Sequence, residues 1–448
     1  MNSPPAAVDE LIEARWVVPV EPHGAVLEHH AIAIRDGRIA ALVPTAEARM
    51  RYAPAKRTIL AHHAVVPGLI NAHTHAAMTL MRGIADDRCL MDWLQGSIWP
   101  IEKAELSYKF VLDGTRLACL EMLRGGTTCF ADMYFFLDAA AQAASEVGIR
   151  ANLGITVIDF PTAWASDLED YLQKGLALRD QLKDEPLLSF CFAPHAPYTI
   201  SDSGFERIAL LSEQVGLPLQ VHLHETVGEI DLGMAQHGCR PIARLERLGL
   251  VGPQLTAVHA VHLDSREIAL FARNGVSIAH CPTSNLKLAS GIAPIAACLE
   301  AGVRVAIGTD GAASNNRLDM PGEMRLAALL AKGSSGRAEA FPVHAVLRAA
   351  TLSAAEALCL DQRIGSIVAG KEADLVAFDY SFLEAQPCFD PVSHLIFVMC
   401  RENVSDVWVR GEAVVEKRRF VNDTARNIEA FGATTLALWQ NRIGRAYR

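Results

Sequence analysis

Short apolar runs rich in Val, Ile, Leu and Ala recur along the middle of the chain and alternate with segments of helical periodicity. Eight such runs lie at 64–75, 127–133, 150–156, 187–195, 217–225, 255–262, 276–282 and 303–310. The helical segments between them include 113–124, 138–147, 202–215 and 292–301. Alternation of buried strands with helices is typical of a parallel sheet. Eight such units favour a closed (β/α)8 TIM barrel over an open sheet.

The two ends of the chain share a different pattern, in which short strands flank tight turns. Near the N-terminus, strands at 31–34 and 39–43 flank an Asp-Gly pair, which is a hairpin signal. The C-terminal part reads as strands at 374–378, 407–409 and 413–415, followed by a helix at 423–440. We therefore expect an α/β protein with a TIM barrel over 64–370. A small β-sandwich domain formed from both termini would comprise residues 1–63 and 371–448.

Charge and composition limit the partners. The 448 residues are 51% hydrophobic and 21% charged, and the formal net charge is −10. A protein that binds nucleic acid needs a basic face, so we expect no nucleic-acid partner. Apolar runs stay short of the roughly 18 residues that a membrane helix needs, so we expect no membrane partner either. The oligomeric state is left open, and a homo-oligomer is compatible with these features.

The compartment is predicted from the N-terminus and the cysteines. Asp9, Glu10 and Glu13 stand where a signal peptide would carry a basic region and an apolar stretch. The ten cysteines form no C-x-x-C pair, and several lie inside apolar runs. Buried free thiols are typical of a reducing compartment, so we predict a cytoplasmic location.

Ionisable residues stand at the carboxyl ends of seven of the eight runs. They are His73, His75, Asp132, His195, His222, His224, Glu225, His259, His262, His280 and Asp310. A single histidine at a strand end is more often a packing residue than a ligand. So many together are hard to explain by packing, because buried ionisable groups cost free energy unless they are paired or coordinated. In a TIM barrel these ends meet at one face, which is where active sites lie.

The first strand end carries a metal-binding spacing. His73 and His75 are two residues apart, so their side chains face the same way and can converge on one ion. Nitrogen and carboxylate ligands without thiolates suit Zn²⁺, and Fe²⁺, Mn²⁺ and Ni²⁺ are less favoured. Strand parity leaves His222 and His224 as equal candidates for a further ligand. With no lysine at a strand end to carry a bridging carbamate, one ion per chain is favoured over two.

Four segments resemble the signatures of the amidohydrolase superfamily. They are PGLINAHTH at 67–75, VHLHET at 221–226, HAVH at 259–262 and GTDGAASNN at 308–316. The later three are similar to one branch, which contains 5'-methylthioadenosine/S-adenosylhomocysteine deaminases and triazine chlorohydrolases. The resemblance covers nearly the whole chain in order. It implies a zinc-dependent deaminase that converts an adenosine-type nucleoside (5'-methylthioadenosine, adenosine or S-adenosylhomocysteine) to the inosine analogue plus ammonia.

The resemblance also implies residue roles. The metal ligands would be His73, His75, His222 and Asp310, with His222 preferred because Glu225 completes the H-x-x-E pattern. Asp310 would accept a proton from the attacking water, and Glu225 would protonate a ring nitrogen. His259 would hydrogen-bond the attacking oxygen and stabilise charge.

Further substrate contacts are implied outside the metal ligands. Glu102 resembles a ribose-binding carboxylate, which can accept hydrogen bonds from two vicinal hydroxyls. Trp93 and His195 match residues that line the pocket, and Glu225 and Asp310 would also touch substrate. The segment 76–105 is too long for a simple connection, so we expect a lid there.

One segment departs from the family pattern. Some members carry arginines after the third strand that hold an amino-acid tail, whereas 154–164 contains no arginine and offers Ile158, Phe160 and Trp164. This favours a methylthio group over a homocysteine tail. The enzyme alternatives are a guanine deaminase or a chlorohydrolase of the same branch. The non-enzyme alternative is a metal-free scaffold on the same fold.

Overall fold

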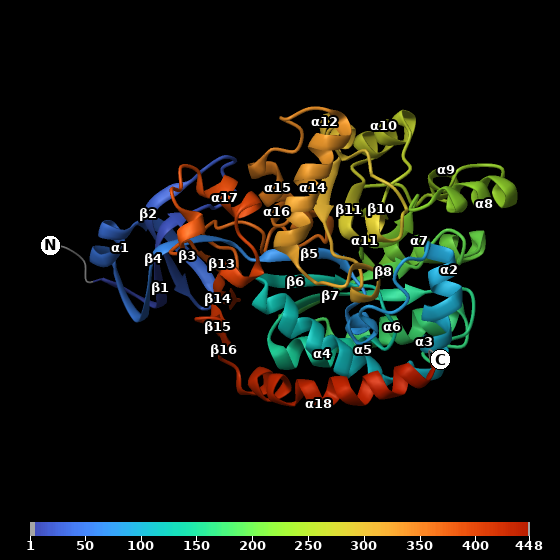
Figure 1. Cartoon of the computed structure of the whole chain (residues 1–448), viewed down its shortest axis with the longest axis horizontal. Helices are drawn as coiled ribbons and strands as arrows, with labels where there is room; N and C mark the ends of the chain where they lie inside the picture. Colours follow the sequence, from blue (N-terminus) through green and yellow to red (C-terminus); the bar gives the residue numbers. More distant parts are fainter. Residues whose placement is uncertain (1–4, 447–448) are drawn as a thin grey trace.

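The computed structural model describes residues 5–446 and places them in two eight-stranded sheets (Figure 1). One sheet is a ring of parallel strands in sequence order: β5 (Leu69–Thr74), β6 (Thr127–Asp132), β7 (Arg150–Val157), β8 (Leu188–Pro194), β9 (Leu219–Leu223), β10 (Leu255–His259), β11 (Ser277–His280) and β12 (Arg304–Ile307). The ring closes where the backbone N–H of Asp310 donates to the carbonyl oxygen of His73 at 3.0 Å. The predicted TIM barrel is confirmed.

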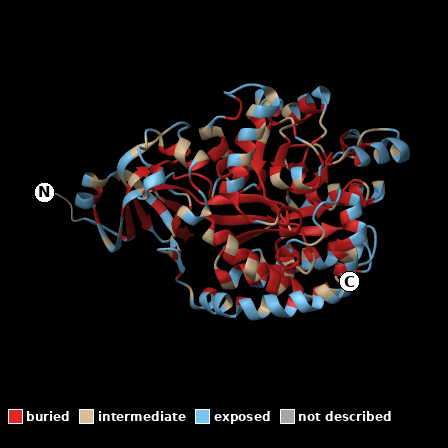
Figure 2. Cartoon of the chain, in the orientation of Figure 1, coloured by how far each residue is buried: buried red, intermediate tan, exposed pale blue. Residues whose placement is uncertain are grey.

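The barrel strands are buried almost throughout, and helices cover their outer side (Figure 2). This burial explains the continuous apolar runs, because a parallel strand packs on both of its faces. The four helices expected from the sequence are present as α4 (Tyr108–Arg124), α5 (Leu137–Val147), α7 (Asp202–Val215) and α12 (Ile295–Glu300).

The other helices surround the barrel or follow it. They are α2 (Leu90–Trp93), α3 (Trp99–Glu105), α6 (Leu168–Leu182), α8 (Val227–His237), α9 (Pro241–Arg247), α10 (Ser265–Asn274), α11 (Pro282–Lys287), α13 (Ala312–Asn315), α14 (Met320–Ser335), α15 (Val343–Ala349), α16 (Leu352–Ala357) and α17 (Pro391–Phe397). Short 3₁₀ or π turns are η1 (Ala76–Met81), η2 (Leu94–Ile98), η3 (Leu383–Ala385) and η4 (Arg401–Asn403).

The second sheet joins both ends of the chain, as predicted. Its order is β16 (Arg419–Phe420), β15 (Glu412–Glu416), β14 (Val404–Val409), β13 (Leu375–Asp379), β4 (Tyr52–Pro67), β1 (Ala6–Val17), β2 (Leu27–Arg35) and β3 (Arg38–Pro44). The helix α1 (Thr45–Arg51) lies between β3 and β4. The Asp36-Gly37 turn has positive φ at both residues, 51° and 74°, as a tight hairpin requires. The boundaries at 63/64 and 370/371 stay a prediction.

One predicted barrel strand is divided between the two sheets. The run 64–75 was expected to form a single barrel strand, but its first four residues end β4, which pairs with β1 and β13. Gly68 separates the halves. A Cβ at this position would lie 2.1 Å from the Thr128 hydroxyl, so only glycine lets the chain pass this close to β6. Continuous hydrophobicity cannot reveal such a crossing, since both halves are buried.

The C-terminal helix α18 (Asp423–Ala446) runs along the lower edge of the barrel in Figure 1, beneath α4. It is longer than the predicted 423–440. Its buried Trp439 packs edge-on against Phe110 and donates its indole N–H to Asp113 at 2.8 Å. Within residues 5–446, every helix is too short or too polar to cross a membrane. All ten cysteines are free thiols, but Cys89, Cys359 and Cys400 are exposed rather than buried as expected.

Candidate metal centre and active site

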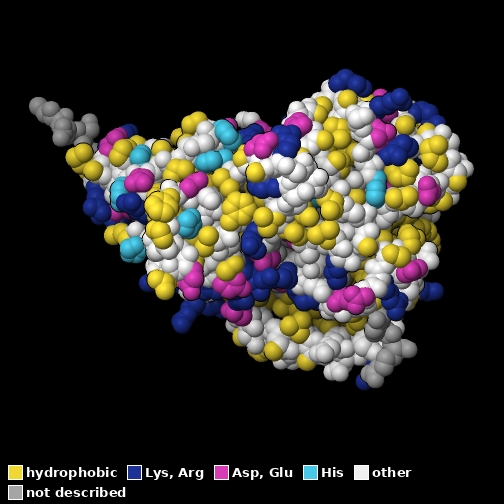
Figure 3. Space-filling model, turned by 45° about the horizontal axis from the view of Figure 1, so that its top comes forward, with side chains coloured by type: hydrophobic (Ala, Val, Ile, Leu, Met, Phe, Trp, Pro, Cys, Tyr) yellow, Lys and Arg dark blue, Asp and Glu magenta, His cyan; other side chains and the backbone are white. Residues whose placement is uncertain are grey.

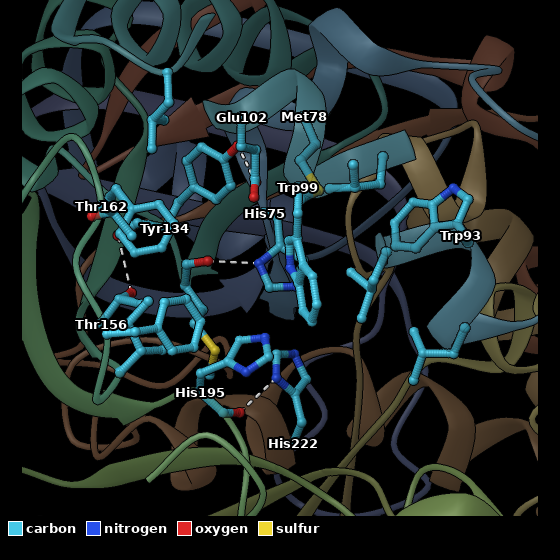
Figure 4. A pocket seen from close by; sticks show the side chains of 18 of the residues that line it. His75, Met78, Trp93, Trp99, Glu102, Tyr134, Thr156, Thr162, His195 and His222 are labelled. Carbon is cyan, nitrogen blue, oxygen red and sulfur yellow. Dashed lines mark hydrogen bonds between the residues drawn. The ribbon is translucent and has the colours of Figure 1, made fainter. Parts of the chain in front are cut away.

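The carboxyl ends of the barrel strands open into one large cavity. Its volume is about 720 Å³, and residues from the strand ends and from the insert 76–105 line it (Figure 4). His75, His222, Glu225, His259 and Asp310 form its floor. The structure therefore brings together these five of the strand-end residues that the sequence singled out.

Three of these residues form a tight cluster with His73. The Nε2 atoms of His73 and His222 lie 3.1 Å apart. The Oδ1 atom of Asp310 lies 3.6 Å from His73 Nε2 and 3.2 Å from His75 Nε2. Ligand atoms about 2.1 Å from a tetrahedral zinc ion lie about 3.4 Å from one another. The observed spacings fit one such ion.

Each imidazole in the cluster is anchored through its Nδ1 atom. Oxygen acceptors lie 2.8 Å from Nδ1 of His73 (Gln220 Oε1), 2.6 Å from Nδ1 of His75 (Met133 O) and 2.7 Å from Nδ1 of His222 (His195 O). These oxygens can only accept, so each ring carries a proton on Nδ1. Gln220 is held in this orientation because its Nε2 donates to the carbonyl oxygen of Ala72 at 2.9 Å. Such outer contacts orient metal-binding histidines.

This tautomer leaves lone pairs facing each other. Neither His73 Nε2 nor His222 Nε2 has a proton to share across the 3.1 Å between them. Burial and the neighbouring rings keep both imidazoles neutral, lowering the pKa of His73 to about 4 and that of His222 well below its usual value. Two neutral nitrogens that point at each other need a cation between them. The donor set therefore fits a zinc ion.

Asp310 supplies the negative charge of the cluster. Burial opposes its ionisation, but contact with His75, whose own pKa this contact raises to about 9, holds the pKa of Asp310 well below the usual range. Its Oδ2 atom accepts hydrogen bonds from the hydroxyls of Ser284 at 2.6 Å and Ser314 at 2.7 Å. Oδ1 stays directed to the histidines. Oδ1 also accepts the backbone N–H of Gly311 at 2.7 Å, so the protein fixes both oxygens of the carboxylate while Oδ1 keeps its contact with the histidines.

Glu225 and His259 lie beside this cluster. Glu225 Oε2 lies 3.7 Å from His259 Nε2, and Glu225 Oε1 lies 3.5 Å from the Ser290 hydroxyl. Burial and the nearby Asp310 carboxylate raise the pKa of Glu225 to about 8, so it carries a proton at neutral pH. His259 donates from Nδ1 to Asn285 Oδ1 at 2.8 Å, which leaves its Nε2 atom as an acceptor.

The wall above the floor carries the predicted substrate contacts. Glu102, on α3, accepts a hydrogen bond from the Tyr134 hydroxyl at 2.7 Å. Trp93 is buried and donates its indole N–H to the carbonyl oxygen of Ile84 at 3.3 Å. His195 packs its ring edge-on against His222, with 5.0 Å between centroids. All three line the cavity.

Two expectations from the sequence are wrong. His224 was as good a candidate ligand as His222 by strand parity, but β9 ends at Leu223 and His224 has a φ of 55°. Its ring turns away from the cluster, and its Nε2 atom accepts the backbone N–H of Ile242 at 3.1 Å. Trp164 was expected in the apolar wall beside Ile158 and Phe160, yet among the described residues it does not line the cavity. It packs against Phe136 instead.

Several supporting residues carried no signal in the sequence. Gln220, Tyr134, Ser284, Asn285 and Ser314 orient the predicted residues, as described above. Ser284 and Asn285 follow the strand-end His280 within five residues, a position that would have drawn attention to them. Lys103 was also missed. It is the single lysine or arginine among the described residues that line the cavity.

Comparisons with known proteins agree with this geometry. The sequence profile of the amidohydrolase family matches residues 64–414. A 5-methylthioadenosine/S-adenosylhomocysteine deaminase of Saccharophagus degradans is 46% identical over 442 residues, which cover 99% of this chain and 98% of that protein. An adenosine deaminase from Xanthomonas campestris, solved with bound zinc, is 50% identical with a TM-score of 0.96 and covers 99% of this chain and 100% of its own. A zinc complex of atrazine chlorohydrolase from Arthrobacter aurescens is 26% identical with a TM-score of 0.88, over 95% and 100% of the two chains.

Proposed function

The chain belongs to the amidohydrolase family, and on this premise we propose that it is a zinc-dependent deaminase of adenosine-type nucleosides. The substrates would be 5'-methylthioadenosine, adenosine and S-adenosylhomocysteine, and the products the inosine analogue and ammonia. The observation that carries the proposal is the cluster of inward-facing Nε2 atoms and the Asp310 carboxylate at the floor of a cavity that also holds a protonated acid, Glu225. Convergence of all four candidate ligands disfavours the metal-free scaffold.

The ion would be held by His73, His75, His222 and Asp310. A zinc ion there supplies Lewis-acid activation of a water molecule at neutral pH. His259 lies beside His73 and His222, and one ring nitrogen from each of the three histidines lies within 4.8 Å of the other two. Because its proton is on Nδ1, His259 accepts a hydrogen bond from the attacking water and orients it. It can stabilise negative charge only after it has taken up a proton.

The acid–base steps balance between two carboxyl groups. Asp310 accepts a proton as the water oxygen adds to the carbon that bears the amine, and Glu225 donates its proton to the adjacent ring nitrogen. Asp310 then gives its proton to the departing ammonia, while Glu225 takes the proton of the new hydroxyl. The raised pKa of Glu225, about 8, suits it to the first donation. Both residues return to their starting states.

Glu102 would bind the ribose, because an ionised carboxylate accepts hydrogen bonds from two vicinal hydroxyls. Trp93 and His195 would contact the substrate from the wall of the cavity. The segment 76–105 stays a predicted lid, and it supplies the wall residues Trp93, Trp99 and Glu102. The proposed small-molecule partner is the nucleoside. On the face shown in Figure 3, basic side chains are mixed with acidic ones, which does not favour a nucleic acid.

The proposed location is the cytoplasm, where the exposed thiols of Cys89, Cys359 and Cys400 would stay reduced. The test of the proposed function is direct. Zinc-loaded protein is incubated with adenosine, 5'-methylthioadenosine, guanine and a chlorotriazine, and ammonia or chloride release is measured. We expect ammonia from the two nucleosides. Release from guanine or chloride from the triazine as the fastest reaction would refute the proposal.

A further inference from the structure

Tyr134 is a buried tyrosine that the mechanism above does not use. It follows β6 by two residues, and its side chain is 4% exposed. Its carbonyl oxygen accepts the Thr156 hydroxyl at 3.0 Å, and its ring lies against Phe135 with 5.5 Å between centroids. The first contact comes from β7 and fixes the backbone of Tyr134, and the second comes from the loop after β6 and packs against its ring.

The Tyr134 hydroxyl points to Glu102 (Figure 4), which lies on α3 at the far end of the insert 76–105. The two oxygens are 2.7 Å apart, the normal length of a strong O–H···O⁻ hydrogen bond. Among the described side chains, this phenol is the donor that holds the Glu102 carboxylate. The contact therefore ties the insert that carries Glu102 to the barrel that carries the histidine cluster.

The hydrogen bond leaves room for a diol. An ionised carboxylate offers about four acceptor positions, and Tyr134 occupies one of them on Oε1. The remaining positions face the cavity, which both residues line. Burial raises the pKa of Glu102 to about 7, and the Tyr134 hydrogen bond opposes that rise. The phenol thus favours the ionised form, which accepts hydrogen bonds without donating any.

We propose that Tyr134 is a positioning residue for ribose recognition, holding the Glu102 carboxylate so that it receives the vicinal hydroxyls of the nucleoside. The inference rests on the proposed function, since it assigns a role in binding that substrate. It predicts that loss of the phenol weakens recognition of the diol and leaves the chemistry at the purine ring unchanged.

The test compares substrates with and without the diol in Tyr134→Phe. We expect the KM for adenosine to rise about tenfold, as loss of a hydrogen bond to a charged group implies, and kcat to stay within about twofold. The KM for 2',3'-dideoxyadenosine should stay unchanged. In a Glu102→Gln background, Tyr134→Phe should add less than about a twofold effect, because the two residues act as one unit.

Matched controls separate positioning from general damage. Tyr198→Phe removes a hydroxyl from the same cavity, and it should leave the ratio of the two KM values unchanged. Zinc content and the thermal unfolding midpoint of Tyr134→Phe should equal those of the unmodified protein. The Tyr134 ring also lies beside His75, so Tyr134→Phe could act through the metal site. An equal rise in KM for adenosine and dideoxyadenosine, or a loss of zinc from Tyr134→Phe, would overturn the inference.

Binding measurements distinguish this failure from failure of the proposed function. Calorimetry with inosine and 2',3'-dideoxyinosine measures recognition of the diol without turnover. If the unmodified protein deaminates no nucleoside but loses inosine affinity on Tyr134→Phe, the proposed reaction fails and the inference stands. If it deaminates adenosine while inosine affinity does not respond to Tyr134→Phe, the inference fails and the reaction stands.

Discussion

Replacing Glu225 by glutamine tests the acid of the proposed reaction most sharply. The side chain is 7% exposed and lies between His259 and Ser290, outside the group of atoms that surrounds His73. Glutamine has nearly the same shape and no ionisable proton. We therefore expect Glu225→Gln to keep its zinc and to lose a factor of about 10²–10⁴ in kcat/KM, the usual contribution of a general acid.

The same change should stabilise the metal-free protein. Burial raises the pKa of Glu225 from 4.5 to about 8 in the folded state, so folding at pH 7 requires the carboxyl group to take up a proton. An acid with a raised pKa destabilises the fold increasingly as pH rises from its unfolded value to its folded value. At about 1.4 kcal/mol per unit of pKa, glutamine should add about 1–3 kcal/mol to the free energy of unfolding at pH 7 and almost nothing at pH 4.

The assays are kcat/KM for adenosine, zinc by elemental analysis, and urea unfolding of metal-free protein at pH 4 and pH 7. Glu246→Gln is the matched control, because Glu246 is an exposed glutamate on α9. It should change neither activity nor stability. Near-normal turnover by Glu225→Gln with a full complement of zinc would remove Glu225 from the mechanism. Equal free energies of unfolding for Glu225→Gln and the unmodified protein at pH 7 would refute the raised pKa of Glu225.

Three further predictions follow from the site. A chelator should abolish deamination and one zinc per chain should restore it, measured by titration; two tightly bound ions in active protein would contradict the single site. Gln220→Leu removes the acceptor of the His73 Nδ1 proton, so zinc affinity should fall about 10–100-fold. A chelator competition measures this affinity, and an unchanged value would show that Gln220 does not orient the His73 ring. Adenosine and 5'-methylthioadenosine should have higher kcat/KM than S-adenosylhomocysteine. The reason is that the exposed Lys103 offers the charged tail of S-adenosylhomocysteine a contact worth only about 0–1 kcal/mol. S-adenosylhomocysteine as the best substrate would contradict this prediction.

The positions of the strand-end residues could be predicted because a barrel brings the carboxyl ends of strands that are far apart in the sequence to one face. His73 and Asp310 are 237 positions apart by number (310 − 73), yet their side-chain atoms lie 3.6 Å apart. The eight hydrophobic runs indicated the barrel, and the barrel geometry then implied the cluster. The fold class and the convergence of the ionisable groups therefore follow from one pattern.

The orienting residues could not be predicted in this way. Gln220 and Asn285 are neutral, so their burial carries no charge penalty that would make them conspicuous. Tyr134 follows β6 as one of three consecutive aromatic residues, and the sequence does not distinguish its hydroxyl from ordinary aromatic packing. Each matters through a single hydrogen bond whose partner lies on another strand or insert. Such a bond depends on the relative rotation of two elements, which periodicity does not record.

The spacing argument fails at His224, and the local backbone explains the different outcomes for His222 and His224. His222 lies inside β9, so alternation of side chains still applies to it. His224 lies one residue beyond the strand, in a left-handed conformation with a φ of 55° that reverses the direction of its side chain. His259 and Asp310 also have positive φ, at 71° and 62°, in a region that side chains other than glycine rarely adopt. Strained backbone concentrates at functional sites. Period-two alternation therefore does not predict side-chain direction at such a strand end. The family resemblance selected His222 because it compares whole motifs and does not depend on strand geometry.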